Sequence, residues 1–226
     1  MNEKEFRHIA NEIRNLGKVS VLRMWIMGEP LLNKNIYEFI KIAKDEQNSI
    51  ADQVEVTTNG SMLTISNIEK LLDSRIDIVK ISIYGIGNRH HEITSSNVKS
   101  ETIFQNVKNL FNRRNETKSN VKIFIKMVDP FDSNELELFK ERYSPLADQI
   151  DVYSPHSWIE DHAIQNYESK FKDKSIYQIR KNLLPKKVCG FPFYTVSIHA
   201  NGDVSVCCVD WEKKTKIGNL HSETVS

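Results

Sequence analysis

Five short apolar segments alternate with segments of helical periodicity along the first 155 residues of this 226-residue chain. Strands that alternate with amphipathic helices pair in parallel through right-handed crossovers. The expected fold is therefore α/β, a partial (β/α) barrel of mainly parallel strands. The first strand is expected to start at Val19 and to stop at Gly28, and the others to cover residues 53–58, 77–84, 121–128 and 149–154.

Apolar residues at helical spacing predict the helices between these strands. The expected helices lie near residues 3–16, 33–43, 66–72, 99–113 and 133–143. Their ends carry capping signals. These signals are Gly17 as a C-cap, Asn33 and Asp132 as N-caps, and Ser66 with Glu69 as a capping box.

The tripeptide Gly28-Glu29-Pro30 follows the first strand directly. Gly28 has no Cβ to keep a ligand off the backbone, and Pro30 pushes Glu29 into an extended conformation. The carboxyl end of parallel strands is where ligands bind in such folds. Together with this position, the tripeptide predicts a ligand-facing turn, although taken alone it is more typical of a proline stop after a buried strand.

The strands have one apolar and one polar face when they are divided by a period of two. The polar faces should converge on a lumen that holds a polar ligand, because the helices must cover the apolar faces. For a single lysine such as Lys126, a side chain that snorkels at the sheet edge is the competing interpretation. The polar sets are Glu55, Thr57 and Asn59, then Lys80 and Ser82, then Lys122, Phe124 and Lys126.

Composition excludes several classes of protein. The chain has 31 basic and 30 acidic residues, so its charge indicates neither nucleic acid nor a membrane surface as a partner. No apolar run is long enough to span a bilayer, and the charged start is unlike a signal peptide. A cytoplasmic protein is expected.

The three cysteines, Cys189, Cys207 and Cys208, are an odd number in the last forty residues, which favours reduced, metal-binding thiols over disulfides. A hairpin is expected at 194–208 around the Asn201-Gly202 turn. On its second strand Cys207 and Cys208 would face opposite ways, so only one could easily join Cys189. Zinc held with His199 or His221 is a weaker alternative, because the ligand spacing is poor.

Two sets of motifs resemble known families. The GEP turn, the sequence Thr57-Thr58-Asn59-Gly60 and Ser82 on the third strand resemble the radical S-adenosylmethionine (SAM) family. Cys189, twelve residues and the sequence GDVSVC ending at Cys207 resemble the start of the SPASM extension, an auxiliary iron-sulfur module, and the sequence IGNL at 217–220 resembles its next turn. Together these resemblances cover nearly the whole chain.

The family resemblance implies a role for each matching residue. Backbone carbonyls of Gly28, Glu29 and Pro30 would hold the methionyl amino group of SAM, and Thr58 and Asn59 would lie near the cofactor. Ser82 would bond the ribose or the carboxylate, and Lys126 would pair with the methionyl carboxylate. The cysteines Cys189, Cys207 and Cys208 would be metal ligands, with Cys207 the favoured partner of Cys189. His156 and Trp158 lie where the family often approaches substrate.

The chain departs from the family in two respects. It lacks the CxxxCxxC loop that holds the [4Fe-4S] cluster, and it has no cysteine before Cys189. It also lacks the strand that would precede the first helix. We therefore expect a partial barrel at 1–155, a helical linker at 156–188 and an incomplete SPASM-like extension at 189–226.

These features predict a fragment of a radical SAM/SPASM enzyme that modifies a peptide or a carbohydrate and is inactive alone. The alternative is a non-catalytic barrel that binds a ligand or a partner. The sequence does not indicate the oligomeric state.

Overall fold

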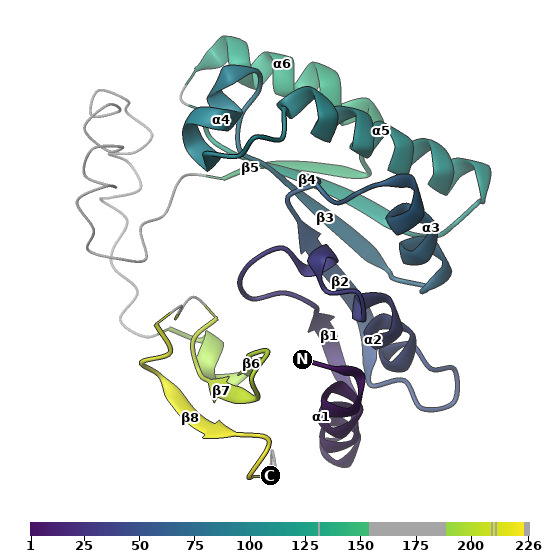
Figure 1. Cartoon of the computed structure of the whole chain (residues 1–226), viewed down its shortest axis with the longest axis vertical. Coiled ribbons are helices and arrows are strands. Elements are labelled where there is room, and N and C mark those ends of the chain that lie inside the picture. The colour runs from purple at the N-terminus through teal and green to yellow at the C-terminus, as the bar shows by residue number, and fades with distance from the viewer. Residues whose placement is uncertain (131, 154–188, 209, 211, 224–226) are drawn as a thin grey trace.

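The computed structural model describes residues 1–130, 132–153, 189–208, 210 and 212–223. Five strands form one sheet in chain order, and every neighbouring pair is parallel (Figure 1). This arrangement confirms the predicted α/β fold. The strands are β1 Val19–Arg23, β2 Ala51–Thr58, β3 Ile78–Ile83, β4 Lys122–Val128 and β5 Gln149–Tyr153.

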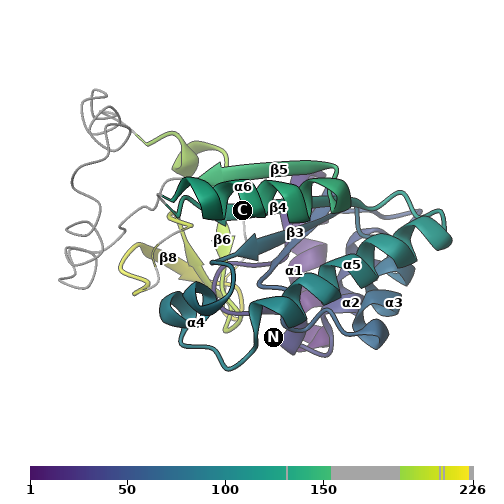
Figure 2. The ribbon, with the colours of Figure 1, turned by 90° about the horizontal axis from the view of Figure 1, so that it is seen from above.

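The helices lie on the outer side of the curved sheet, and its inner side faces the C-terminal part of the chain (Figures 1 and 2). A capping box between Asn2 and Glu5 starts the first helix, and Gly17 ends it as predicted. Among the described residues, no helix has the length and apolar character needed to cross a membrane. The helices are α1 Glu3–Leu16, α2 Ile36–Ala43, α3 Ile65–Asp73, α4 Asn88–Thr94, α5 Ser100–Glu116 and α6 Ser133–Tyr143.

Local details differ from the sequence-based expectation at the ends of elements. Strand β1 ends at Arg23 rather than at Gly28, and a 3-10 helix, Pro30–Leu32, precedes α2. The N-cap of α2 is Asn35, because the Asn33 side chain instead accepts the Asn35 N–H in a turn.

The N-terminal caps of α3 and α6 agree with the sequence-based prediction in one case of two. Thr64, not Ser66, caps α3, since its hydroxyl accepts the Asn67 N–H. Asp132 caps α6 as predicted, accepting the N–H groups of Asn134 and Glu135. The seven-residue helix α4 was not predicted.

Side chains alternate along each strand between an apolar outer face and a more polar inner face, as the sequence predicted. Val79, Ile81, Ile123 and Ile125 are all at most 1% exposed and join the core under the helices. On the inner face, the polar residues Glu55, Thr57 and Ser82 are also buried. These buried polar groups line an inner surface that apolar packing does not fill.

Two aspartates at the amino ends of strands fix neighbouring strands in register. The Asp77 carboxylate accepts the Val54 N–H at 2.7 Å and the Lys44 ammonium at 2.8 Å. Asp148 precedes β5 as Asp77 precedes β3, and its carboxylate accepts the Ile123 N–H of the neighbouring strand β4 at 2.8 Å. Each side chain satisfies a strand N–H that the ladder leaves free.

The C-terminal part forms a separate antiparallel sheet of three strands: β6 Ser197–Ile198, β7 Asp203–Ser205 and β8 Lys216–Asn219. The predicted hairpin is confirmed, with shorter strands and with a third strand where a turn was expected. Gly202 takes a φ of +80° in its turn, and a Cβ there would lie 2.6 Å from the His221 ring. The predicted linker at 156–188 lies outside the described residues.

Strand β7 ends at Ser205, so Cys207 and Cys208 lie in the loop that follows it. The expectation that they face opposite sides of a strand was therefore wrong. The small sheet is attached to the barrel: the His8 ring nitrogen Nε2 lies 2.9 Å from the Leu220 carbonyl oxygen, and Val204 and Leu220 belong to the main apolar core.

We expect Asp77→Ala to lower the free energy of unfolding by about 1 to 3 kcal/mol, because it leaves the Val54 N–H without a partner. Urea denaturation measures the change. Asp52→Ala is the matched control, since the exposed Asp52 carboxylate pairs with Lys18 alone in the described part of the chain, and its loss should cost less than about 1 kcal/mol. Equal effects of the two substitutions would contradict the proposed role of Asp77.

Candidate functional site

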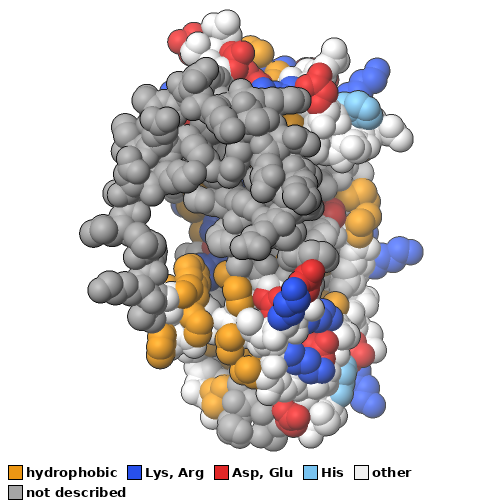
Figure 3. Space-filling model, turned by 90° about the vertical axis from the view of Figure 1, so that its left-hand side faces the viewer, with side chains coloured by type: hydrophobic (Ala, Val, Ile, Leu, Met, Phe, Trp, Pro, Cys, Tyr) orange, Lys and Arg blue, Asp and Glu red, His pale blue; other side chains and the backbone are white. Residues whose placement is uncertain are grey.

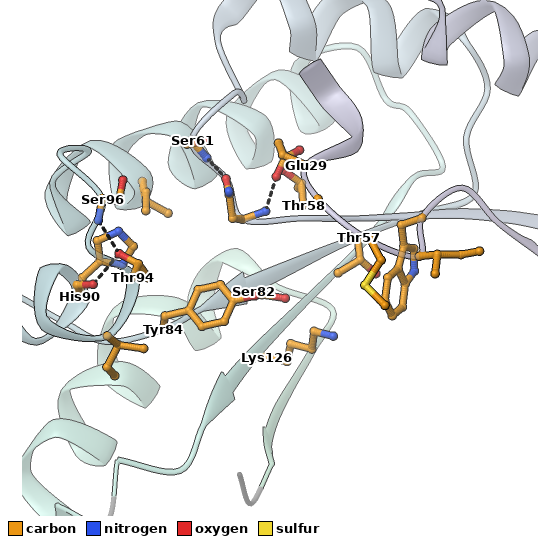
Figure 4. A pocket seen from close by; sticks show the side chains of 17 residues that line it. Glu29, Thr57, Thr58, Ser61, Ser82, Tyr84, His90, Thr94, Ser96 and Lys126 are labelled. Atoms are coloured by element: carbon orange, nitrogen blue, oxygen red, sulfur yellow. Dashed lines mark hydrogen bonds between the residues drawn. The ribbon is translucent and has the colours of Figure 1, made fainter. Parts of the chain in front are cut away.

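A cavity of about 500 Å³ lies at the carboxyl ends of β1 to β4. This is the size of a typical small-molecule site. Its walls include most of the residues singled out from the sequence, and Figure 4 shows them around one space. Pro30 is the one predicted binding residue that does not line it. The predicted residues that do are Gly28, Glu29, Thr58, Asn59, Ser82 and Lys126.

The Glu29 carboxylate joins the turn after β1 to the turn after β2. One oxygen, Oε1, accepts the Thr58 hydroxyl at 2.7 Å and the Leu31 N–H at 3.1 Å. The other, Oε2, accepts the Asn59 N–H at 2.7 Å. Such charge-assisted bonds are stronger than neutral ones. The Glu29 side chain thus has a structural task that the sequence analysis, which considered only its backbone carbonyl, did not find.

The backbone at Gly28 is open toward a ligand. Gly28 has a φ of +78°, and a Cβ placed there would meet no atom within 4 Å. Glu29 is extended, with φ −106° and ψ 110°, as the following proline requires. The turn therefore needs glycine for its conformation, and it leaves space beside the main chain.

Lys126 lies on the inner face, with its ammonium 5.4 Å from the centre of the Trp25 ring and 6.0 Å from that of Tyr153. Burial lowers the pKa of Lys126, the charge of Lys80 lowers it further, and Glu55 opposes the change. No carboxylate of the described residues forms an ion pair with this ammonium. Lys126 is therefore a partly buried cation that can receive an anionic ligand group.

Two buried polar atoms of the cavity lack a partner, and one of them belongs to a residue that the sequence analysis did not find. The Thr57 hydroxyl and the His90 nitrogen Nε2 find no hydrogen-bond partner among the described residues. Burial, with a smaller contribution from His91, lowers the pKa of His90 and so favours its neutral imidazole. Tyr84 could have been found from its position two residues after Ser82, but no sequence signal points to His90.

The three cysteines are free thiols in the C-terminal part. Burial raises the pKa of the Cys208 thiol, Cys207 and Cys189 raise it further, and Arg23 opposes the rise. Cys207, Cys189 and Arg23, the last residue of β1, therefore lie close enough to Cys208 to affect the charge of its thiol. In the part of the chain that the structure describes, no group of three or more His, Cys, Asp or Glu side chains is placed to hold a metal ion.

The remaining candidates named from the sequence have different outcomes. His199, which the zinc alternative invoked, is buried in the small sheet, where its Nε2 lies 3.0 Å from the Ser205 hydroxyl. His156 and Trp158 lie outside the described residues.

Exposed apolar side chains gather where the C-terminal part begins. Figure 3 shows hydrophobic side chains grouped on the side of the molecule that carries this part of the chain. The exposed side chains of this segment are Phe191, Phe193, Tyr194 and Val196. They begin two residues after Cys189, so this exposed apolar segment follows the first of the three cysteines closely in the sequence.

Sequence profiles of two families match the chain. The profile of the radical SAM superfamily matches residues 1–141, and that of SPASM, an iron-sulfur cluster-binding domain, matches residues 189–226. No curated protein sequence matches the chain.

Solved structures share the fold. Streptococcus suis SuiB bound to S-adenosylmethionine has a TM-score of 0.64 and 16% identity, over 98% of this chain and 57% of SuiB. SuiB bound to precursor peptide SuiA gives 0.62 and 16%, over 98% of this chain and 56% of that one. BtrN in complex with AdoMet and 2-DOIA gives 0.53 and 15%, over 100% and 68%. The chain thus spans little more than half the length of SuiB, and at these identities the likeness concerns the fold alone.

We expect Glu29→Gln to weaken the contact between the turn after β1 and the turn after β2. Both Glu29 oxygens now accept hydrogen bonds, and in glutamine one of them is replaced by an NH₂ group, which would face a hydrogen-bond donor. The free energy of unfolding should fall by about 1 to 3 kcal/mol, and hydrogen exchange at the Asn59 amide should accelerate. Glu38→Gln is the matched control, because the Glu38 side chain on α2 is 44% exposed and, among the described residues, pairs with Arg7 alone. Unchanged exchange at Asn59 in Glu29→Gln would refute the junction.

Proposed function

Because the chain belongs to the radical SAM superfamily and carries a SPASM-type iron-sulfur extension, we propose that its cavity binds SAM. We further propose that it serves the radical modification of a peptide or a carbohydrate. The observation that carries this proposal is the Glu29 junction, which holds the turns at Gly28 and Asn59 over one cavity with Ser82 and Lys126 on its walls. The fold of SuiB bound to precursor peptide SuiA supports the peptide alternative.

The residues around the cavity fit SAM chemically. SAM has a zwitterionic methionyl group, a sulfonium and a ribose, so it needs both charged and neutral polar partners. The open backbone from Gly28 to Pro30 would hold the methionyl amino group, and the unpaired Lys126 ammonium would take the carboxylate. Ser82 would bond the ribose or the carboxylate. The Thr57 hydroxyl, buried without a partner among the described residues, gives the cavity one further unsatisfied polar group.

Thr58 and Asn59 would act differently from each other at this site. The Thr58 hydroxyl donates to Glu29 and accepts the Gly60 N–H at 3.1 Å, so it would position the turn rather than bind the cofactor. The Asn59 carbonyl oxygen Oδ1 accepts the Ser61 N–H at 2.9 Å. Its amide Nδ2 donates to no other described residue, so its hydrogens would be available to a ligand.

Together with a reduced [4Fe-4S] cluster, SAM supplies the one-electron chemistry that starts a radical reaction. The chain's own part would be to bind and orient the cofactor, with the Trp25 ring as one wall of the cavity. All three cysteines of the sequence lie at Cys189 and beyond. We therefore propose that these residues act within a longer enzyme, and that Cys189, Cys207 and Cys208 bind metal in the extension. Free thiols suit a reducing, cytoplasmic setting.

The lack of cysteines in the barrel favours one alternative, a barrel that binds SAM or a similar nucleotide without catalysis. The two functions share the cavity and differ in redox chemistry. They are therefore separated by measuring binding and cleavage independently.

We expect Gly28→Val to lower the affinity for SAM by at least about tenfold, since its side chain would occupy the space beside the turn and lose one charge-assisted contact. Isothermal calorimetry measures the affinity, which should be weak in the wild type without a cluster. Gly17→Val is the matched control: Gly17 has a φ of +103°, a Cβ there meets nothing, and it lies at the end of α1. It should bind SAM as the wild type does. Wild-type affinity in Gly28→Val would reject the site.

We expect this chain, purified alone, to form no 5′-deoxyadenosine from SAM, because the barrel supplies no thiolate to hold a cluster at the cavity. The test is anaerobic reconstitution with iron and sulfide, followed by dithionite and SAM, with chromatographic detection. Product above a no-protein control that persists in Cys189→Ala would overturn this expectation.

A further inference from the structure

A charged cluster lies on the inner face of the sheet, one layer below the cavity. Its centre is Glu55 on β2, two residues before the cavity residue Thr57 and only 2% exposed. Its oxygen Oε1 lies 2.8 Å from Arg23 Nε on β1, and Oε2 lies 2.7 Å from Lys80 Nζ on β3. Register places Arg23 beside Glu55 and Lys80 beside Thr57. Three adjacent strands thus contribute to one cluster.

The cluster carries more positive than negative charge. Two cations face one carboxylate, and neither Arg23 nor Lys80 forms an ion pair with any other described carboxylate. The Arg23 side chain is 48% exposed and the Lys80 side chain 26%. The terminal guanidinium nitrogens of Arg23 and two ammonium hydrogens of Lys80 remain as donors. Among the described residues, the cluster therefore keeps partly exposed donors that no carboxylate uses.

Glu55 holds these donors in place. A buried carboxylate needs compensation, but one well-placed cation supplies it, and a second leaves surplus positive charge on the lumen wall. That surplus reaches Lys126 as well, because Lys80 contributes to the lowered pKa of Lys126. A fork of guanidinium donors beside an ammonium matches the oxygens of a carboxylate or a phosphate.

We propose that Arg23 and Lys80 form a substrate subsite that binds an anionic oxygen group, the carboxylate of an acidic peptide side chain or the phosphate of a sugar. The inference rests on the proposed function, in which SAM occupies the cavity beside Gly28 and Lys126. The substrate would then place its anionic group beside Glu55 and Lys80, two residues further from the carboxyl ends of the strands than Thr57 and Ser82. Glu55 acts as the positioning residue, because its carboxylate holds both cations in place.

The first test compares charged probes with neutral isosteres. N-acetylglutamate α-amide is compared with N-acetylglutamine α-amide, and glucose 6-phosphate with glucose. Binding is followed by nuclear magnetic resonance at the Arg23 Nε–H signal, which is assigned by its loss in Arg23→Lys. The charged member of at least one pair should bind and shift this signal, and its neutral partner should not. The pair that responds identifies the peptide or the sugar phosphate as the source of the anion.

The second test removes the donors one at a time. Lys80→Gln should weaken the charged probe at least about tenfold, because one charge-assisted contact is lost while Arg23 still compensates Glu55. Arg23→Lys keeps the charge but loses the fork, so it should weaken binding several-fold. Lys41→Gln is the control for net charge, since Lys41 lies on α2 and pairs with Asp73 outside the lumen. It should leave the affinity unchanged.

This inference and the proposed function can fail separately. Lys80→Gln should keep wild-type affinity for SAM, and Gly28→Val should keep the affinity for the charged probe. Equal binding of charged and neutral probes, or an unchanged affinity in a folded Lys80→Gln protein, would overturn the anion subsite. Loss of SAM binding in Lys80→Gln would show instead that Lys80 belongs to the cofactor site.

Discussion

The site depends on the carboxylate of Glu29. Parallel strands place successive turns at one edge of a sheet, but hydrogen bonds of the ladder end before the turns begin, so something else must hold these turns in register. Glu29 does this by accepting donors from its own turn and from the turn after β2, at Thr58 and Asn59. Because Gly28 and Asn59 are then fixed relative to each other, the cavity between them has a defined shape.

The inner face of the sheet is polar because the helices bury only the outer face. Helices pack against Val79, Ile81 and their neighbours, and the opposite face is left with Glu55, Thr57 and other polar residues that cannot pack against apolar surface. Buried charges require partners. Glu55 therefore gathers cations from the strands on either side, and the same packing rule that builds the core also builds a charged lumen.

The alternation of strand and helix periods was enough to predict that the five strands are parallel, and the Asn201-Gly202 turn was enough to predict the antiparallel hairpin. These features follow from local preference and from which face must be buried. Capping depended on competition between neighbours: Asp132 caps α6 as its sequence predicts, but Thr64 rather than Ser66 caps α3, and Asn33 is engaged in a turn. Similar side chains a few residues apart offer the same hydrogen bond, and only the path of the chain decides which one makes it.

The sequence by itself determined which residues face the lumen, because strand alternation puts Thr57, Ser82 and Lys126 on one side. It also determined the family, through the order of short motifs. Only the tertiary structure decided how these residues meet: that Glu29 binds the next turn, that His90 enters the cavity from α4, and that Arg23 and Lys80 converge on Glu55. The physical reason is distance along the chain. Contacts between residues about thirty positions apart depend on crossover geometry and register, which no local pattern encodes.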